Sequence, residues 1–293
     1  MYIIELLKAL FLGIVEGITE WLPISSTGHM ILVDEFISLN VSEEFLELFL
    51  VVIQLGAIAA VPVLFWDRLY PFSRKKSQAE RKNILSLWLK VIVGVLPAAV
   101  LGVLLDDLLD MYLYNYVVVA IALIVYGVLF IFVEKNLAER FLNKKSNEGK
   151  GNFTRKIRVE SIEALSYADA LKIGGFQVLS LIPGTSRSGS TILGGMLTGV
   201  SRTVSAEFSF FMAIPIMLGA SGLKVLKYFL EGNSPTVDEI ILLLVGIVVS
   251  FAVSVFVIKF LMDFVKRHDF SAFGIYRIAL GVLVLLYFLL KTI

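Results

Sequence analysis

The sequence contains no cysteine and only two histidines among its 293 residues. The absence of cysteine excludes disulfides, thiolate metal sites and cysteine nucleophiles. Charge is also scarce, because Asp, Glu, Lys and Arg make up 17% of the chain and their formal sum is +1. A surface that binds nucleic acid needs an excess of basic side chains. Nucleic acid is therefore not expected as a partner.

Apolar residues are abundant, at 58% of the chain with a mean hydropathy of +0.86. A soluble domain of this length cannot normally bury so many apolar side chains. Six stretches are long and apolar enough to cross a hydrocarbon core of about 30 Å as helices. They cover residues 45–66, 86–105, 115–133, 206–230, 237–262 and 271–290. The sequence therefore predicts an all-α integral membrane protein with six transmembrane helices.

Two further apolar regions are interrupted by polar residues. Residues 1–40 are interrupted by Glu16, Glu20, Pro23 and the run Ser-Ser-Thr-Gly-His, whereas residues 166–200 contain the run Pro-Gly-Thr-Ser-Arg-Ser-Gly-Ser. The apolar arms on either side of each run are too short to cross a membrane comfortably. Each region is therefore predicted to form a re-entrant helix hairpin with a polar tip.

The two hairpins divide the chain into two similar halves. Residues 1–134 contain the first hairpin and three spans, and residues 163–293 contain the second hairpin and three spans. A basic linker, residues 135–162, joins them. Because each half has an odd number of spans, the second half is expected to be inverted relative to the first. Interrupted segments at matching positions of inverted halves point to a site at the membrane midplane.

The distribution of charge predicts the orientation in the membrane. Basic residues gather in the loop 67–83, the linker 135–162 and the loop 263–270. The connections around residues 106–110 and 231–235 contain acids and no Lys or Arg. By the positive-inside rule the basic side is cytoplasmic. The first hairpin is then expected to enter from outside and the second from the cytoplasm, so that their tips can meet.

Two acids precede the first polar tip. Glu16 and Glu20 are four residues apart, and a helix places such a pair on one face, where like charges repel. Inside a membrane this pair needs a cation, an arginine or a proton on one acid. A structural ion pair that lines a water-filled vestibule is the alternative interpretation.

The first tip itself carries the hydroxyls of Ser25, Ser26 and Thr27, followed by His29. Any one of these hydroxyls could merely satisfy backbone groups at a broken helix. As a cluster near His29 and Glu20, they offer a nucleophile, a proton carrier and an orienting acid.

The second tip supplies a fixed positive charge, Arg187, within a Gly- and Ser-rich turn. A guanidinium group beside the backbone N–H groups of a helix N-terminus forms a cradle for phosphate. The alternative is that Arg187 only neutralises Glu16 or Glu20. A second arginine, Arg277, lies within the last span, where we expect it to snorkel to the surface or to pair with an acid.

The strings EGITEWLPISSTGHMIL, residues 16–32, and PGTSRSGST, residues 183–191, resemble the undecaprenyl-diphosphate phosphatases of the bacitracin-resistance type. The resemblance extends along essentially the whole chain. It implies hydrolysis of undecaprenyl diphosphate to undecaprenyl phosphate and inorganic phosphate in the bacterial plasma membrane. This reaction recycles the lipid carrier of cell-wall synthesis and confers resistance to bacitracin. With the predicted orientation, we expect the site to open to the outer face.

The resemblance also implies roles for individual residues. The predicted catalytic residues are Glu20, Ser26, His29 and Arg187. The predicted substrate-binding residues are Glu16, Ser25, Thr27, Ser186, Ser188 and Gly189. A Mg²⁺ or Ca²⁺ ion is expected, with Glu16 and Glu20 as the natural carboxylate pair. Ser26 is expected to attack the terminal phosphorus while His29 and Glu20 move the proton, and His29 stays open as the alternative nucleophile.

Two alternatives accompany this interpretation. A lipid-phosphate transporter or flippase could use the same Glu and Arg side chains, because inverted repeats with re-entrant hairpins are a transport architecture. The Ser and His pair favours the enzyme, since transport does not require it. A homodimer packed through small residues near Gly94, Gly102 and Gly246 is also compatible with the sequence.

Overall fold

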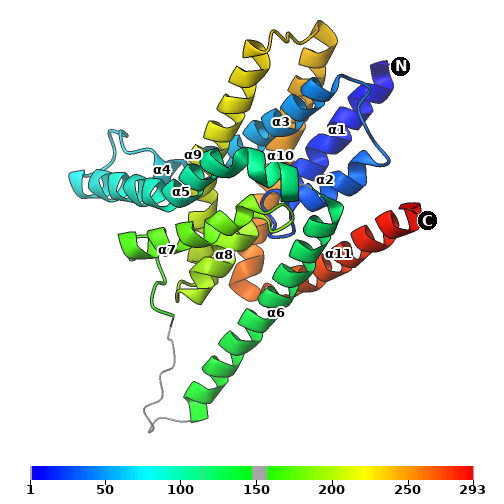
Figure 1. Cartoon of the computed structure of the whole chain (residues 1–293). Coiled ribbons are helices and arrows are strands. Elements are labelled where there is room, and N and C mark those ends of the chain that lie inside the picture. The colour runs from blue at the N-terminus through cyan, green and yellow to red at the C-terminus, as the bar shows by residue number, and fades with distance from the viewer. Residues whose placement is uncertain (1, 114, 147–156, 293) are drawn as a thin grey trace.

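The structure is a computed structural model that describes residues 2–113, 115–146 and 157–292. Within these ranges it is helical, and its only β-structure is an isolated bridge between Val159 and Val200. The helices, shown in Figure 1, are α1 (Tyr2–Thr19), α2 (Ser26–Asp34), α3 (Glu43–Leu64), α4 (Trp66–Leu69), α5 (Gln78–Leu113), α6 (Tyr116–Ser146), α7 (Tyr167–Val178), the 3₁₀ helix η1 (Leu179–Leu181), α8 (Arg187–Leu197), α9 (Arg202–Leu230), α10 (Val237–Arg267) and α11 (Ser271–Thr292). The predicted all-α class is confirmed.

Six of these helices are long and apolar enough to cross a membrane, namely α3, α5, α6, α9, α10 and α11. They correspond one to one with the six predicted spans, so the chain is a multi-pass membrane protein. The helices extend beyond the apolar stretches at charged ends. Helix α5, for example, begins at Gln78 and includes Glu80, Arg81 and Lys82 before its apolar part. Glu, Arg and Lys are good helix formers, so the helix continues where the hydropathy signal stops.

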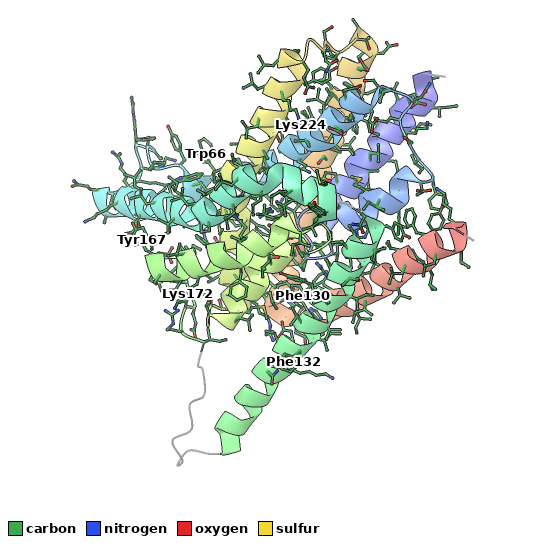
Figure 2. All side chains as sticks on the ribbon, in the orientation of Figure 1. Trp66, Phe130, Phe132, Tyr167, Lys172 and Lys224 are labelled. Carbon is green, nitrogen blue, oxygen red and sulfur yellow. The ribbon has the colours of Figure 1, made fainter. Side chains whose placement is uncertain are left out.

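The outer surface is apolar, as a membrane protein requires. Val103, Leu104 and Phe256 are each at least 70% exposed. On α6, Phe130 is fully buried whereas Phe132 is 62% exposed, and Figure 2 shows both side chains on that helix. A soluble protein does not normally expose so many large apolar side chains, but lipid tails solvate them well.

Glycines allow several helix pairs to approach closely. A methyl group on Gly174 of α7 would lie 2.1 Å from the carbonyl oxygen of Gly94 on α5. A methyl group on Gly13 of α1 would lie 2.9 Å from the carbonyl oxygen of Gly246 on α10. Small residues at helix contacts are typical of membrane proteins, because backbone packing replaces the hydrophobic effect there. Gly94 and Gly246 therefore serve contacts within the chain, and a dimer surface built on them is not what the structure shows.

The buried first half of α9 forms the centre of the protein. Phe208, Phe210 and Phe211 of this helix are fully buried. Trp21, in the turn that follows α1, is also fully buried and meets the ring of Phe210 edge-on, with the ring centroids 5.2 Å apart. Aromatic pairs in this geometry add to the stability that burial provides. This contact anchors the turn after α1 against the middle of the molecule.

We predict that Gly174→Ala destabilises the protein and that Gly175→Ala does not. The first methyl group would clash with the backbone of Gly94, which should cost about 1–3 kcal/mol of unfolding free energy. Gly175 has no atom within 4 Å of the added methyl group, so alanine there should gain up to about 1 kcal/mol of helix propensity. Thermal unfolding of the two detergent-purified variants checks this, and equal midpoints would contradict the α5–α7 contact.

Candidate active site

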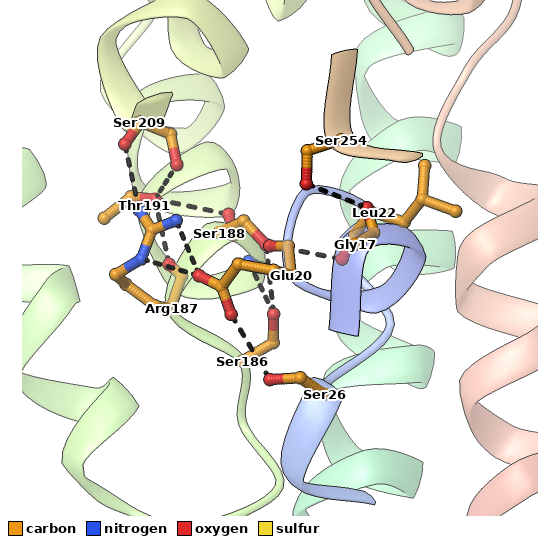
Figure 3. Close-up of polar contacts among 11 residues, drawn as sticks. Gly17, Glu20, Leu22, Ser26, Ser186, Arg187, Ser188, Thr191, Ser209 and Ser254 are labelled. Atoms are coloured by element: carbon orange, nitrogen blue, oxygen red, sulfur yellow. Dashed lines mark hydrogen bonds and ion pairs between the residues drawn. The ribbon is translucent and has the colours of Figure 1, made fainter. Parts of the chain in front are cut away.

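Two turns, each between consecutive helices, lie close to one another inside the protein. The first turn, residues 20–25, joins α1 to α2, and the second turn, residues 182–186, joins η1 to α8. Ser188, the second residue of α8, donates from Oγ to the carbonyl oxygen of Glu20 in the first turn at 3.2 Å. Figure 3 shows side chains of both segments directed toward one another. The predicted meeting of the two polar tips is thus found in the contacts of this structure.

Each turn ends in a serine with the same unusual backbone. Ser25 has a φ of 74° and Ser186 a φ of 69°, and they are the two non-glycine residues with positive φ in the described part of the chain. Each is the N-cap of the next helix. The hydroxyl of Ser25 accepts from the N–H of Gly28 at 3.3 Å, and that of Ser186 accepts from the N–H of Gly189 at 3.2 Å. The backbone of a residue other than glycine rarely adopts a positive φ unless surrounding contacts fix it. Such strained positions are common at functional sites.

A carboxylate joins the two turns. Arg187 Nη2 donates to Glu20 Oε1 at 3.0 Å, and Arg187 Nε donates to the same oxygen at 3.3 Å. Ser26 Oγ donates to the other oxygen, Glu20 Oε2, at 3.3 Å (Figure 3). Arg187 also donates to the carbonyl oxygen of Ser209 on α9 at 2.9 Å. Glu20 therefore links the hydroxyl of Ser26, at the start of α2, to the guanidinium of Arg187, at the start of α8. Arg187 does neutralise an acid of the first turn.

The second acid, Glu16, has no such partner. It is 1% exposed, and its Oε1 atom has no hydrogen-bond partner among the described residues. An unpaired polar atom at this depth is costly unless something binds to it. The described residues contain no group of three or more His, Cys, Asp or Glu side chains that could hold a metal on their own. Any ion here would need oxygen ligands in addition to the two carboxylates.

His29 lies near the first turn but has other partners than Ser26. Its Nδ1 atom is 2.7 Å from the carbonyl oxygen of Ser25, which can only accept, so Nδ1 carries the hydrogen. Its Nε2 atom is 2.7 Å from the hydroxyl of Tyr276 on α11 and accepts from it. The hydroxyl of Ser26 is instead bonded to Glu20. The structure thus brings Ser26 together with Glu20 and Arg187, and it directs the His29 ring toward α11.

The remaining predicted residues surround this centre in different ways. Ser25 and Ser186 use their hydroxyls as helix caps, and Gly189 provides one of the capped N–H groups. Ser188 Oγ lies 3.2 Å from Ser186 Oγ and also bonds to the backbone of the first turn. The half-buried hydroxyl of Thr27 makes no hydrogen bond within the described residues.

The structure adds residues that the sequence did not single out as functional. Thr191 Oγ1 donates to Ser209 Oγ at 2.7 Å beside Arg187, and Tyr276 holds the His29 ring. Arg277 is fully buried and pairs with no acid among the described residues, so the expectation that it snorkels or forms an ion pair is wrong. A charge within a span was the one signal in the sequence that could have identified it.

Comparison with known proteins gives consistent matches along the chain. Residues 9–283 match the family model described as bacitracin resistance protein BacA. Three similar relatives are each named undecaprenyl-diphosphatase. One from Acetivibrio thermocellus is 56% identical over 98% of both chains, and one from Enterococcus faecalis is 58% identical over 97% of both. A third, from Desulfitobacterium hafniense, is 52% identical over 100% of this chain and 99% of its own.

We predict that the Glu20–Arg187 pair is a coupled unit. Arg187→Met should lower the unfolding free energy by about 3–5 kcal/mol, because it leaves Glu20 and Glu16 buried without a cation. The double variant Glu20→Gln/Arg187→Met should recover part of this loss. A thermal-unfolding cycle over the wild type, both single variants and the double variant measures the coupling. Strict additivity would contradict a direct interaction.

A matched control is the exposed pair of Lys266 and Asp263, whose side chains are 57% and 76% exposed. Asp263→Asn should change stability by no more than about 1 kcal/mol, because water screens exposed pairs.

Proposed function

Because the chain belongs to the bacitracin resistance protein BacA family, we propose that it hydrolyses undecaprenyl diphosphate to undecaprenyl phosphate and inorganic phosphate. This reaction recycles the lipid carrier for cell-wall synthesis and confers bacitracin resistance. The observation that carries the proposal is the hydrogen bond of 3.3 Å between Ser26 Oγ and Glu20 Oε2, at a carboxylate that Arg187 holds from the other turn. A hydroxyl beside a general base and a guanidinium is what phosphoryl transfer through serine requires.

In the proposed first step, Ser26 Oγ attacks the terminal phosphorus and its proton moves to Glu20. The bond between that phosphorus and the bridging oxygen breaks, so the lipid monophosphate leaves and takes the proton from Glu20. In the second step, Glu20 takes a proton from water, which attacks the phosphoserine. Inorganic phosphate leaves and Ser26 regains its proton, so one water molecule is consumed in each cycle.

Arg187 and the two helix N-termini are proposed to bind the diphosphate. Helices α2 and α8 both begin at this site, and the positive ends of their dipoles attract phosphate oxygens. Arg187 is only partly buried, with 12% of its side chain exposed, so it can contact an entering anion. Its charge would stabilise the transition state. Ser188 Oγ lies 3.2 Å from Ser186 Oγ. The hydroxyls of Thr27, Ser186 and Ser188 are proposed as further phosphate ligands.

Ser26 is favoured over His29 as the nucleophile. Both ring nitrogens of His29 are engaged, one as a donor to Ser25 and one as an acceptor from Tyr276. Ser26 already shares its hydrogen with a carboxylate. We therefore propose that Glu20 moves the proton and that His29 holds the backbone of Ser25 at the start of α2.

A divalent cation fits the acids of the first turn. Glu16 offers a buried carboxylate oxygen without a hydrogen-bond partner, and Glu20 lies one helical turn further along. Mg²⁺ is commonly bound by one or two carboxylates together with substrate phosphates. We propose that Glu16 and Glu20 hold Mg²⁺ or Ca²⁺ in this way, where the ion would neutralise charge on the phosphate oxygens.

The inverted repeat is also part of the proposal. Helix pairs α1–α2 and α7–α8 occupy equivalent places in the two halves, residues 1–134 and 163–293. In each pair, the serine that caps the second helix has a positive φ. Helix α1 packs on α10, and its counterpart α7 packs on α5, the counterpart of α10. This exchange of equivalent partners supports two re-entrant hairpins in halves of opposite orientation.

The proposed location is the bacterial plasma membrane, with the site open to the outer face. The sequence supports this orientation, because the basic residues lie in the loop 67–83, the linker 135–162 and the loop 263–270. Arg68 pairs with Glu207, and Lys90 donates to the carbonyl oxygen of Glu163 at 3.4 Å. In Figure 2, Tyr167 and Lys172 lie around α7, while Lys224 lies toward the far end of α9. Basic loops of this kind are typical of the cytoplasmic side.

We predict that purified wild type releases phosphate from undecaprenyl diphosphate in the presence of Mg²⁺ or Ca²⁺. Ser26→Ala and Arg187→Ala should each lower kcat by about 10²–10³-fold, because one removes the nucleophile and the other removes charge stabilisation. Ser221→Ala is the control, since that buried hydroxyl bonds to Val51 on α3 and lies outside the two turns. Its activity should equal that of the wild type.

Three results would change this proposal. If folded wild type released no phosphate with any ion, the lipid transporter or flippase would become the better explanation. If Ser26→Ala were active while His29→Ala were inactive, His29 would be the nucleophile. If Glu16→Gln kept the ion dependence of the wild type, Glu16 would not be a metal ligand.

A further inference from the structure

Arg277 on α11 is a buried cation that has no acidic partner in the part of the chain that the structure describes. It is 0% exposed, and its hydrogen bonds are all to main-chain carbonyl oxygens. Its guanidinium carbon lies 5.4 Å from the centroid of the Tyr126 ring on α6. Placing an arginine at this depth is costly, and such residues in transmembrane segments mark functional sites. The mechanism above assigns it no role.

The carbonyl groups that Arg277 binds belong to both turns. Nη1 donates to Pro23 of the first turn at 3.0 Å. Nη2 donates to Gly184 and Thr185 of the second turn, at 2.8 Å and 2.9 Å. The planar guanidinium presents several donors in a fixed arrangement, so a single side chain can hold two backbone segments in one relative position.

These carbonyl groups lie directly before the two strained serines. Pro23 precedes Ser25 by two residues, and Gly184 precedes Ser186 by two residues. Ser25 and Ser186 adopt φ values of 74° and 69°, which persist only where neighbouring contacts fix the backbone. Arg277 fixes the peptide groups on the entry side of both serines at once.

The helices that start after these serines carry the proposed reacting groups. Ser26 is the first residue of α2, and Arg187 is the first residue of α8. A rotation of either turn would move Ser26 or Arg187 relative to Glu20. The Arg277 guanidinium also lies close to the start of α8, because a methyl group on Gly189 would be 3.1 Å from Nη1. The N–H groups of Arg277 therefore bind the backbone just before the first residues of α2 and α8.

We propose that Arg277 is a positioning residue that holds the two turns against each other and so fixes the arrangement of Ser26, Glu20 and Arg187. This inference rests on the proposed phosphatase activity for its kinetic test. Arg277 touches neither the reacting hydroxyl nor the carboxylate in the structure, so its effect on the reaction acts through the backbone.

The kinetic test uses the full chain, purified in detergent, with undecaprenyl diphosphate as substrate. Arg277→Gln should lower kcat by about 10²-fold, because displacements of about 1 Å at a reacting centre can cost that much. Arg277→Lys keeps the charge but has a single ammonium group that cannot reproduce the planar fork. It should still lose about tenfold in kcat, and KM should change less than kcat in both variants, because the phosphate-binding groups are all retained.

The matched control is Arg202→Lys. Arg202 on α9 also joins the two halves, through Glu134 on α6, but it contacts neither turn. Lysine can keep that ion pair, so kcat should stay within about twofold of the wild type. A kcat for Arg277→Lys that also stays within twofold would overturn the inference, as would equal falls in kcat for the two Lys variants.

A second measurement does not depend on activity. Because the chain has no cysteine, spin labels can be attached to Phe36→Cys, just after α2, and Leu179→Cys in η1, at side chains that are 70% and 41% exposed. The distance distribution between the labels should broaden in Arg277→Lys and stay narrow in Arg202→Lys. If the wild type proved inactive, the proposed function would fail while this measurement still decided the role of Arg277. An unchanged distribution in Arg277→Lys would overturn the positioning role.

Discussion

The contact on which the rest of the site depends is the ion pair between Glu20 and Arg187. These residues are 167 positions apart in the sequence and lie in different halves of the chain. A buried ion pair repays the loss of hydration only when its geometry is good and its remaining groups are hydrogen-bonded. Here Ser26 donates to the second carboxylate oxygen, and the third guanidinium nitrogen, Nη1, donates to the carbonyl oxygen of Ser209. The pair therefore couples the nucleophile candidate to the charge that would bind phosphate.

The position of the two turns inside the protein explains why so much structure surrounds this one pair. Backbone outside regular helices is tolerated at membrane depth only where the protein itself satisfies its polar groups. In this chain the two turns are satisfied by Ser25, Ser186, Ser188 and Arg277, and the first turn is also anchored by Trp21. Close helix contacts at glycines let the helices enclose the turns. The same contacts also fix the relative positions of Ser26, Glu20 and Arg187.

The arrangement fits hydrolysis better than transport of the intact lipid. A transporter needs a charged site that can face both sides, and it has no use for a hydroxyl bonded to a carboxylate. Here both turns are tied to each other and to α11 by hydrogen bonds from one buried arginine. Rigid positioning of this kind favours catalysis, because rate depends on the placement of reacting groups.

The sequence by itself determined the class of protein, the six spans and the residues of the two polar tips. Hydropathy and length are local properties, so the spans could be read without knowing the fold. The local spacing of Glu16, Glu20, Ser26 and Arg187 was equally visible. Only the tertiary structure decided which atoms meet: that Ser26 bonds to Glu20 while His29 turns to Tyr276, and that Gly94 and Gly246 pack inside the chain. Arg277 was likewise one charge in an apolar span until the fold brought two distant turns within reach of its guanidinium.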